Sequence, residues 1–310
     1  MKRIALGPLY YEFSRHNPIR ARLQPGETVV VESEDAFSGQ IRTNDDRRDK
    51  VRQPGSNPLT GPLWIEGAEP GDAIAVKIES IQPLIGQCAT RTGDAGMLSQ
   101  WLGSDCPHGV HVCPIRDGQI FWSDDVVIPY QPMLGCIGVA PASGVPTTLP
   151  AGPHGGNLDL VEVCPGHVVL LPVFVPGALL YLGDAHAAMG HGELSASGLE
   201  MPAETVITVN VLKGQKLPGP RVELPDEIMT VGTGLPMERA TAEAFARMIL
   251  WMEESFGWDR WRAYDLLTHV ARMSIGYYAV GTVGVKIARR YLSGSHAGSV
   301  GCSLGGLNRE

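Results

Sequence analysis

An aspartate and a histidine stand two positions apart in the segment 182–187, which reads Leu-Gly-Asp-Ala-His-Ala and follows an apolar run. Alternate side chains of a β-strand point to the same face, so we expect Asp184 and His186 to lie side by side. A carboxylate and an imidazole suit Zn²⁺ or a similar divalent cation, and such a site with an open position acidifies a water molecule. Taken alone, the same pair is more often a buried ion pair.

A second group of polar side chains falls in one loop, Pro-His-Gly-Gly-Asn-Leu-Asp. Its glycines permit positive φ and a close approach of the backbone to a ligand, so we expect His154, Asn157 and Asp159 to converge on one point. A polar turn whose Asn and Asp bond their own backbone is the alternative. The tight segment 190–193, Gly-His-Gly-Glu, is placed to swing Glu193 over the same site as a general base.

Two further motifs are weaker. Cys106, His108, His111 and Cys113 bring four ligand-type side chains into eight residues, but their spacing matches none of the usual zinc templates. The segment 301–305 matches the nucleophile-elbow pattern G-x-S-x-G of serine hydrolases. That pattern needs a following helix and downstream acid and histidine partners, for which the five remaining residues leave no room. We assign neither motif a function.

The elements that must position these residues are mostly short strands. Glycine and proline number 38 and 24 of 310 residues and form no repeat, and so many chain reversals favour sandwiches and barrels. A Pro-Gly turn precedes each of three expected strands, at 27–32, 73–81 and 168–174. A fourth strand is expected at 206–212.

Toward the C-terminus, apolar residues at helical spacing predict a helix over 237–256 and another over 260–271, before a last strand at 277–287. The fold class predicted is mainly β with a smaller α/β part: a β-sandwich or barrel-like core followed by a C-terminal helix pair and a strand. We expect residues 1–215 to form a β-rich domain carrying the metal site. Residues 216–310 would form the smaller part, packed on the first as one compact unit.

Charge and composition exclude several classes of partner. The formal net charge of -8, from 25 Lys and Arg against 33 Asp and Glu, leaves no positive field for a phosphate backbone, so no nucleic acid is expected. The sequence has no run of about 18 apolar residues and no signal-peptide pattern, so we expect no membrane and a cytoplasmic protein. The six cysteines form no disulfide framework and are expected to be reduced.

With these residues in view, the sequence resembles the acetamidase/formamidase family of metal-dependent amidohydrolases. The matching segments follow one another in order from about residue 23 to about residue 290. They are Glu-Asp-Ala-Phe-Ser-Gly-Gln-Ile at 34–41, Thr-Gly-Pro at 60–62, Ile-Glu-Gly-Ala-Glu-Pro-Gly-Asp at 65–72, Ile-Gly-Val-Ala-Pro-Ala at 137–142, the loop 153–159, Leu-Pro-Val-Phe-Val-Pro-Gly-Ala at 171–178, and Gly-Asp-Ala-His-Ala-Ala at 183–188 with 190–193.

The resemblance implies a β-rich fold and hydrolysis of formamide, acetamide or small lactams to a carboxylate and ammonia or an amine. It also implies homo-oligomers, with a dimer favoured, and a divalent cation for which Zn²⁺ is favoured and Ca²⁺ and Mn²⁺ stay open. By position, the implied metal-site residues are Asp35, His154, Asp184 and His186, with Asn157, Asp159 and Glu193 around them.

In the mechanism that follows, the cation activates a water molecule, with Asp35 or Asp159 completing or orienting its shell. Glu193 takes the water proton and returns it to the leaving nitrogen, while Asn157 or Gln40 stabilises the oxyanion. The partner is thus a small-molecule amide. The alternative from another class is a non-catalytic metal- or ligand-binding β-rich module that holds an ion with the same residues.

Two features depart from the family pattern. His191 stands where the family often has an acidic residue in Gly-Asp-Gly-Glu, and its imidazole is a further candidate ligand or proton shuttle. The segment 88–113, with the Cys/His motif, looks particular to this chain. The amide that the protein accepts therefore stays open.

Overall fold

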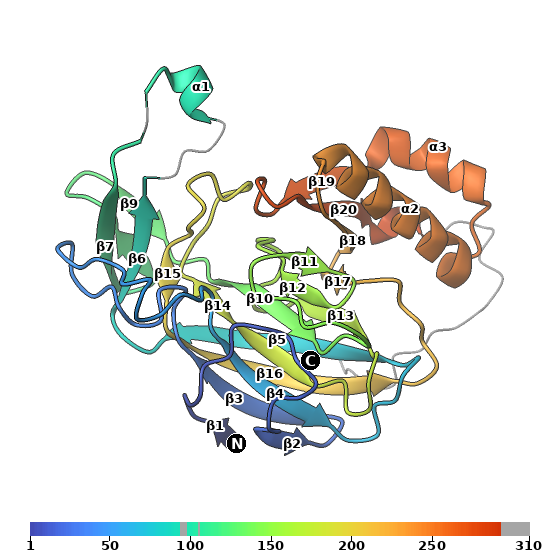
Figure 1. Cartoon of the computed structure of the whole chain (residues 1–310). Coiled ribbons are helices and arrows are strands. Elements are labelled where there is room, and N and C mark those ends of the chain that lie inside the picture. The colour runs from blue at the N-terminus through green and yellow to red at the C-terminus, as the bar shows by residue number, and fades with distance from the viewer. Residues whose placement is uncertain (94–97, 105, 293–310) are drawn as a thin grey trace.

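Two β-sheets dominate the computed structural model, which describes residues 1–93, 98–104 and 106–292 (Figure 1). The first sheet has nine strands, whose neighbours run antiparallel except for the first pair. Their spatial order is β1 (Lys2–Ile4), β3 (Glu27–Ser33), β16 (Ala203–Leu212), β5 (Ala73–Pro83), β13 (Val168–Pro172), β17 (Arg221–Glu223), β18 (Glu227–Thr233), β20 (Thr282–Ala288) and β19 (Arg272–Ile275).

The second sheet has eleven strands. Its main path runs through β11 (Ala151–Gly152), β12 (Gly155–Asn157), β10 (Met133–Val139), β14 (Leu180–His186), β15 (Glu200–Met201), β6 (Gln87–Thr92), β7 (Gly109–Arg116), β8 (Gln119–Phe121) and β9 (Val127–Pro129), while β4 (Leu59–Ile65) pairs with β14 and β2 (Ala21–Leu23) pairs with β4. Figure 1 shows the β6–β7 hairpin rising from the body, with the short helix α1 (Leu98–Leu102) at its end.

The two sheets share one hydrophobic core. Val29 and Ile74 of the first sheet and Ile137 and Leu182 of the second are fully buried in the same cluster of apolar side chains. Strands β10 and β14 are buried at every position. Because buried polar groups need partners, the polar residues that β14 carries into this core must be hydrogen-bonded, paired or bound to a ligand.

The strands predicted behind the Pro-Gly turns are confirmed as β3, β5 and β13, and the fourth predicted strand is part of β16. At each of the three turns the glycine has φ between 82° and 96°. This is left-handed backbone that glycine adopts at little cost and that a type II turn requires. The predicted fold class, mainly β with a sandwich-like core, is likewise confirmed.

The two predicted helices are also present, as α2 (Met237–Phe256) and α3 (Arg260–Val270). Helix α2 ends at Gly257, which has φ 67°, and the carboxylate of Asp259 accepts hydrogen bonds from the first backbone N–H groups of α3. The apolar side of α2 packs against β18 and β20, and α3 packs against α2, on one side of the body (Figure 1).

The last strand differs from its predicted bounds. Residues 277–281 form a turn in which the Gly281 N–H donates to Tyr277 O, so β20 begins only at Thr282. A single turn of 3₁₀ helix, Arg289–Tyr291, follows it. In the described part of the chain, no helix is both long and apolar enough to cross a membrane.

The first sheet continues across residue 215, because β13 pairs with β17. The division into segments 1–215 and 216–310 stays a prediction.

Candidate active site

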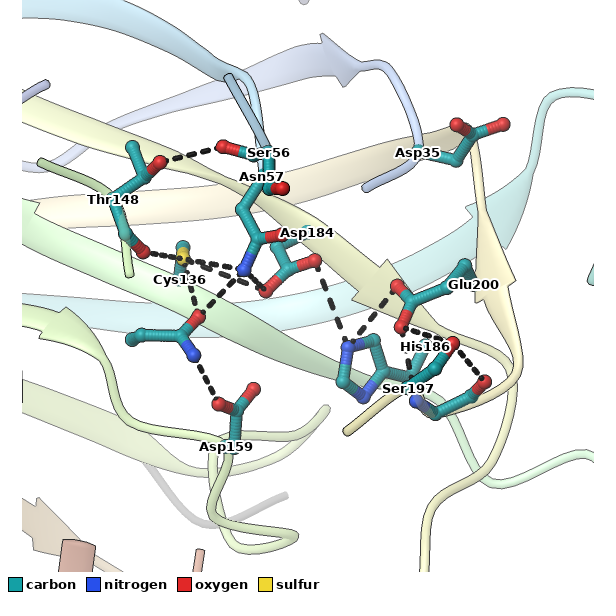
Figure 2. A network of polar contacts seen from close by, with 12 residues as sticks. Asp35, Ser56, Asn57, Cys136, Thr148, Asp159, Asp184, His186, Ser197 and Glu200 are labelled. Carbon is teal, nitrogen blue, oxygen red and sulfur yellow. Dashed lines mark hydrogen bonds and ion pairs between the residues drawn. The ribbon is translucent and has the colours of Figure 1, made fainter. Parts of the chain in front are cut away.

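Two neighbouring strands of the second sheet carry a buried histidine between two carboxylates. His186 is the last residue of β14 and lies directly opposite Glu200 of β15. Its Nε2 is 3.2 Å from Glu200 Oε2 and 3.7 Å from Asp184 Oδ1 (Figure 2). These three side chains, here named the Glu200 group, offer ligand atoms that lie within 4.8 Å of one another.

A second group shares the same histidine. Asp159, two residues after β12, and Glu193, in the loop after β14, also bring ligand atoms within 4.8 Å of one another and of His186. We name these three residues the Glu193 group, and the five residues of both groups the acidic cluster. Glu193 is 7% exposed and the other four at most 3%.

Three carboxylates of the cluster are each held through one oxygen only. Glu200 Oε1 accepts a hydrogen bond of 2.9 Å from the backbone N–H of Gly198, Asp184 Oδ2 accepts one of 3.0 Å from Asn57 Nδ2, and Asp159 Oδ2 accepts one of 2.5 Å from Asn157 Nδ2. Among the described residues, the other oxygens of these carboxylates have no hydrogen-bond donor, while Glu200 Oε2 and Asp184 Oδ1 form ion pairs with His186 Nε2. One oxygen of each carboxylate is thus positioned by a hydrogen bond, and the other is not.

Two glycines make room for the cluster. A Cβ at Gly135 would lie 2.4 Å from Asp184 Oδ2 and 2.5 Å from Asp159 Oδ1, and a Cβ at Gly198 would lie 2.5 Å from His186 Nδ1. Real side chains do not tolerate such distances, so only glycine at these positions lets the carboxylates and the imidazole approach.

The backbone is strained at the same residues. Asp159, Asp184 and Glu193 have φ of 47°, 58° and 43°, and Asn57 has φ of 55°. Left-handed backbone is uncommon outside glycine and costs about 1–3 kcal/mol per residue, and such residues gather at functional sites. The fold therefore holds these side chains in place against a local preference.

The electrostatics of the cluster favour a positive ligand. Burial raises the pKa of the Asp159 carboxyl to about 8, and the charge of Asp184 adds to the effect. Burial also raises the pKa of Glu193 and of Glu200. At His186 burial acts to lower the pKa, but the neighbouring carboxylates outweigh it and hold the pKa well above its ordinary value. A bound cation would reverse these effects on the carboxylates by stabilising their charged forms.

Comparison with known proteins places the chain in a family. The sequence matches the model of the acetamidase/formamidase family over residues 11–149 and 140–276. The chain belongs to the acetamidase/formamidase family. The solved acetamidase from Yersinia enterocolitica is 33% identical, with a TM-score of 0.86 over 92% of this chain and 90% of that chain.

Three curated proteins are similar to this member of the acetamidase/formamidase family. A putative formamidase of Schizosaccharomyces pombe is 28% identical over 259 residues, which are 63% of this chain and 62% of that protein. The acetamidase of Mycolicibacterium smegmatis is 28% identical over 261 residues, which are 64% of each chain. The alignment with a formamidase of Methylophilus methylotrophus covers 65% of that protein. The chain thus spans less than two thirds of the length of these curated relatives.

The structure brings together four of the residues predicted for the site, namely Asp184, His186, Asp159 and Glu193. Asp35 lies apart from them in Figure 2, and its carboxylate accepts a hydrogen bond of 2.5 Å from Arg42.

Three other predicted residues also lie outside both groups. The ring of His154 packs edge-on against Phe13 with centroids 4.9 Å apart, and burial lowers its pKa to about 4. Asn157 uses both ends of its amide, because Nδ2 donates to Asp159 while Oδ1 accepts from Asn57. His191 is exposed.

The weaker motifs do not form a site in the described residues. Cys113 lies opposite Cys88 across two strands, and the ring of His111 stacks on Trp122 with centroids 5.1 Å apart. The described cysteines are free. The segment 301–305 lies outside the described residues.

Sequence reasoning missed three residues of the site, namely Glu200, Asn57 and Cys136. Glu200 reaches His186 only through the register of β14 with β15, which no sequence pattern gives. Asn57 donates to both Asp184 and Asn157, and Cys136 Sγ lies 2.8 Å from Asn157 Oδ1 (Figure 2). The polar turn around Asn57 is the sequence feature that could have indicated this residue, whereas no sequence pattern indicates Cys136.

The cluster fits a divalent cation. Carboxylate oxygens and an imidazole nitrogen are the ligands that Zn²⁺ and Mn²⁺ accept, and outer residues that hold ligands in place are typical of metal sites. The buried carboxylate oxygens without a hydrogen-bond donor around His186 support this fit.

Proposed function

We propose that the chain hydrolyses the C–N bond of small aliphatic amides, of the formamide or acetamide type, to a carboxylate and ammonia. The observation that carries this is the set of three carboxylates, each hydrogen-bonded through one oxygen only, around a fully buried histidine in a member of the acetamidase/formamidase family. A fold that needed only a stable core would not leave these oxygens undonated.

The cation of this proposal is divalent, with Zn²⁺ favoured and Ca²⁺ or Mn²⁺ open. Asp184, His186 and Glu200 would hold it. When bound, it supplies Lewis acidity toward the amide carbonyl and lowers the pKa of water. Asn57, Asn157 and the Gly198 N–H orient the carboxylates through their hydrogen bonds and thus act as positioning groups.

Glu193 is the residue for proton transfer. Its ligand atom lies within 4.8 Å of those of Asp159 and His186, and at 7% it is the most exposed side chain of the cluster. It would accept the proton of the attacking water and return it to the leaving nitrogen.

Of the two amide side chains predicted for the oxyanion, Gln40 is the one we retain. Both ends of the Asn157 amide are engaged, which gives Asn157 a positioning role. Gln40 uses its Oε1 to accept the Asp49 N–H, whereas its buried Nε2 has no acceptor among the described residues. A free donor of this kind is what an oxyanion site requires.

The substrate class follows from the same chemistry. Small amides offer few atoms for binding, so weak affinity is expected, and small lactams stay within the proposed range. We further propose a cytoplasmic homo-oligomer, with a dimer favoured, which light scattering on the purified chain tests directly.

Ammonia release is the test of this function. Purified protein would be assayed with formamide, acetamide, propionamide and a five-membered lactam, before chelation, after chelation and after Zn²⁺ is added back. We expect ammonia from at least one linear amide, its loss on chelation and its return with Zn²⁺. Activity that survives chelation would remove the cation from the reaction. No ammonia from any metal-loaded sample would favour the non-catalytic binding module.

A further inference from the structure

The loop between β3 and β4 lines most of a cavity of about 490 Å³, here named the loop pocket. Its charged lining residues are Arg47, Asp49 and Arg52. Leu9 and Gln40 also line it, and its lining includes no residue of the acidic cluster. Small-molecule sites in proteins typically enclose about 300–1,000 Å³ and combine apolar contacts with a few polar groups. The loop pocket has the size and the kind of lining of such a site.

The two guanidinium groups of the loop pocket have no acidic partner. Among residues 1–93, 98–104 and 106–292, no carboxylate forms an ion pair with Arg47 or Arg52, although the chain has 33 acidic residues against 25 basic ones. Residues 47–52 read Arg-Arg-Asp-Lys-Val-Arg, which places four basic residues beside one acidic residue. In an acidic chain, guanidinium groups that gather at a cavity without counter-charges favour an anionic ligand.

Hydrogen bonds within the loop hold its basic segment in place. Arg47 Nη1 donates to the backbone oxygens of Asn44 and Asp46, at 3.1 Å and 2.7 Å. Arg48 Nη1 donates to Ser56 Oγ at 2.8 Å and so ties the start of the segment to the residues that follow it. Because these groups are ordered before a ligand arrives, binding costs less conformational entropy.

Asp49 sets both the shape and the charge of the loop pocket. Its Oδ1 accepts hydrogen bonds of 2.9 Å from the N–H groups of Val51 and Arg52. Its own N–H donates to Gln40 Oε1 at 2.7 Å, while the buried Gln40 Nε2 has no acceptor among the described residues. Two guanidinium groups and one carboxylate leave one net positive charge, which suits a monoanion better than a dianion such as phosphate.

We propose that the loop pocket binds a small organic monocarboxylate, whose oxygens pair with the guanidinium groups of Arg47 and Arg52 and whose apolar part contacts Leu9. A planar guanidinium group matches a carboxylate through two parallel hydrogen bonds. An oxygen of the ligand would also supply the acceptor that Gln40 Nε2 lacks. The inference goes beyond the proposed function, because it concerns binding and requires no turnover.

Propionate and inorganic phosphate are the probes. Isothermal titration calorimetry on the purified full chain at low ionic strength would be run at about pH 8, where phosphate is mainly a dianion. We expect one propionate per chain, weaker binding as salt is added, and a lower affinity for phosphate. Arg47→Gln and Arg52→Gln should each weaken propionate binding by about 5- to 20-fold, because each removes charged hydrogen bonds. Gln40 stays unchanged in every variant, since the proposed function also uses its Nε2.

Arg15→Gln is the matched control. Like Arg47, Arg15 donates to a backbone oxygen, that of Ala142 at 2.7 Å, and it has no acidic partner in the described part of the chain. It does not line the loop pocket. Arg15→Gln should therefore bind propionate as the wild type does.

Asp49→Asn tests the charge balance with a gain of binding, which misfolding cannot produce. Asparagine keeps an Oδ1 acceptor for the N–H groups of Val51 and Arg52 but removes the negative charge. The variant should bind propionate about 3- to 10-fold more tightly than the wild type, because one repulsive charge beside the ligand is lost. Phosphate should gain more than propionate, since it carries more negative charge.

The outcomes separate this inference from the proposed function. Propionate binding that is unchanged in Arg47→Gln and Arg52→Gln would place the carboxylate elsewhere and overturn the assignment to the loop pocket. Phosphate bound more tightly than propionate by the wild type would overturn the monocarboxylate class. No binding of either probe by protein that releases ammonia would overturn the loop pocket and leave the amidase standing. Arginine-dependent propionate binding by protein that releases no ammonia would support the loop pocket and remove the amidase.

Discussion

Two regions of this protein bury carboxylates, and they do so in opposite ways. Glu162 is 5% exposed, and its Oε1 lies 2.5 Å from Lys286 Nζ and 2.5 Å from Ser274 Oγ. The acidic cluster, in contrast, gathers four carboxylates around His186 with no lysine or arginine paired to them in the described part of the chain. Glu162 thus has a lysine as its counter-charge, whereas the four carboxylates of the cluster have only the shared histidine.

The pKa values of the two regions differ accordingly. Burial alone would raise the pKa of Glu162, but the Lys286 ammonium and the Ser274 hydroxyl outweigh it and hold that pKa below its ordinary value. In the cluster, burial raises the pKa of Asp159 to about 8. A buried carboxylate with a protein cation stabilises the fold, whereas a set of buried carboxylates without one requires protons or a bound cation.

The largest expected effect comes from the shared histidine. His186→Ala should lose cation binding by at least about 100-fold and ammonia release altogether, because both groups lose their common ligand. The matched control is His154→Ala, at a second buried histidine that lies outside both groups. It should lower the melting temperature through lost packing on Phe13 and still bind the cation. Metal analysis and the ammonia assay on both variants test this prediction. Loss of the cation in His154→Ala would show that His154 is a ligand.

A smaller effect is expected from the proton acceptor. Glu193→Gln keeps a side-chain oxygen for coordination but no longer accepts a proton, so the turnover number should fall by about 10²- to 10⁴-fold. Cation binding should change little. Steady-state kinetics with metal content measured on the same samples provide the check, and turnover equal to that of the wild type would exclude Glu193 from proton transfer.

Much of this fold follows from local sequence patterns. Pro-Gly turns mark the starts of β3, β5 and β13, and helical spacing marks α2 and α3. These elements are predictable because turn chemistry and hydrophobic periodicity act over a few neighbouring residues. The start of β20 is not predictable in this way, because it depends on where the turn that ends at Gly281 closes.

The site is only partly predictable, because it is assembled across strands. Asp184 and His186 stand two positions apart in one strand, and this spacing predicts that they lie close together. Glu200 comes next to His186 only through the register of β14 with β15. His154 lies outside both groups, with its ring packed against Phe13, and its role as a ligand stays a prediction.

Next in size is the effect of breaking the internal ion pair. Glu162→Gln leaves the largely buried Lys286 ammonium without a counter-charge, and the free energy of unfolding should fall by about 2–4 kcal/mol. Ammonia release per folded molecule should be unchanged. Denaturant unfolding and the ammonia assay measure the two effects. In the Glu162→Gln/Lys286→Met double variant most of the lost stability should return, since no unpaired charge is then buried. Equal losses in the single and double variants would show that the ion pair does not matter.

The smallest expected effect is the pH dependence of that ion pair. Because the folded pKa of Glu162 lies below its ordinary value of 4.5, the carboxylate stabilises the fold above the unfolded pKa, and this stabilisation is lost as the pH falls through the folded pKa. The difference in unfolding free energy between wild type and Glu162→Gln should therefore be constant from about pH 7 to about pH 5.5 and shrink below about pH 4.5. Denaturant unfolding over this pH range measures it. Chelation should not change this difference, because the counter-charge of Glu162 is Lys286 and not a bound cation. Any stabilisation by added Zn²⁺ must instead act through the acidic cluster. A difference that already shrinks between pH 7 and pH 5.5 would mean that the Glu162 pKa is not lowered.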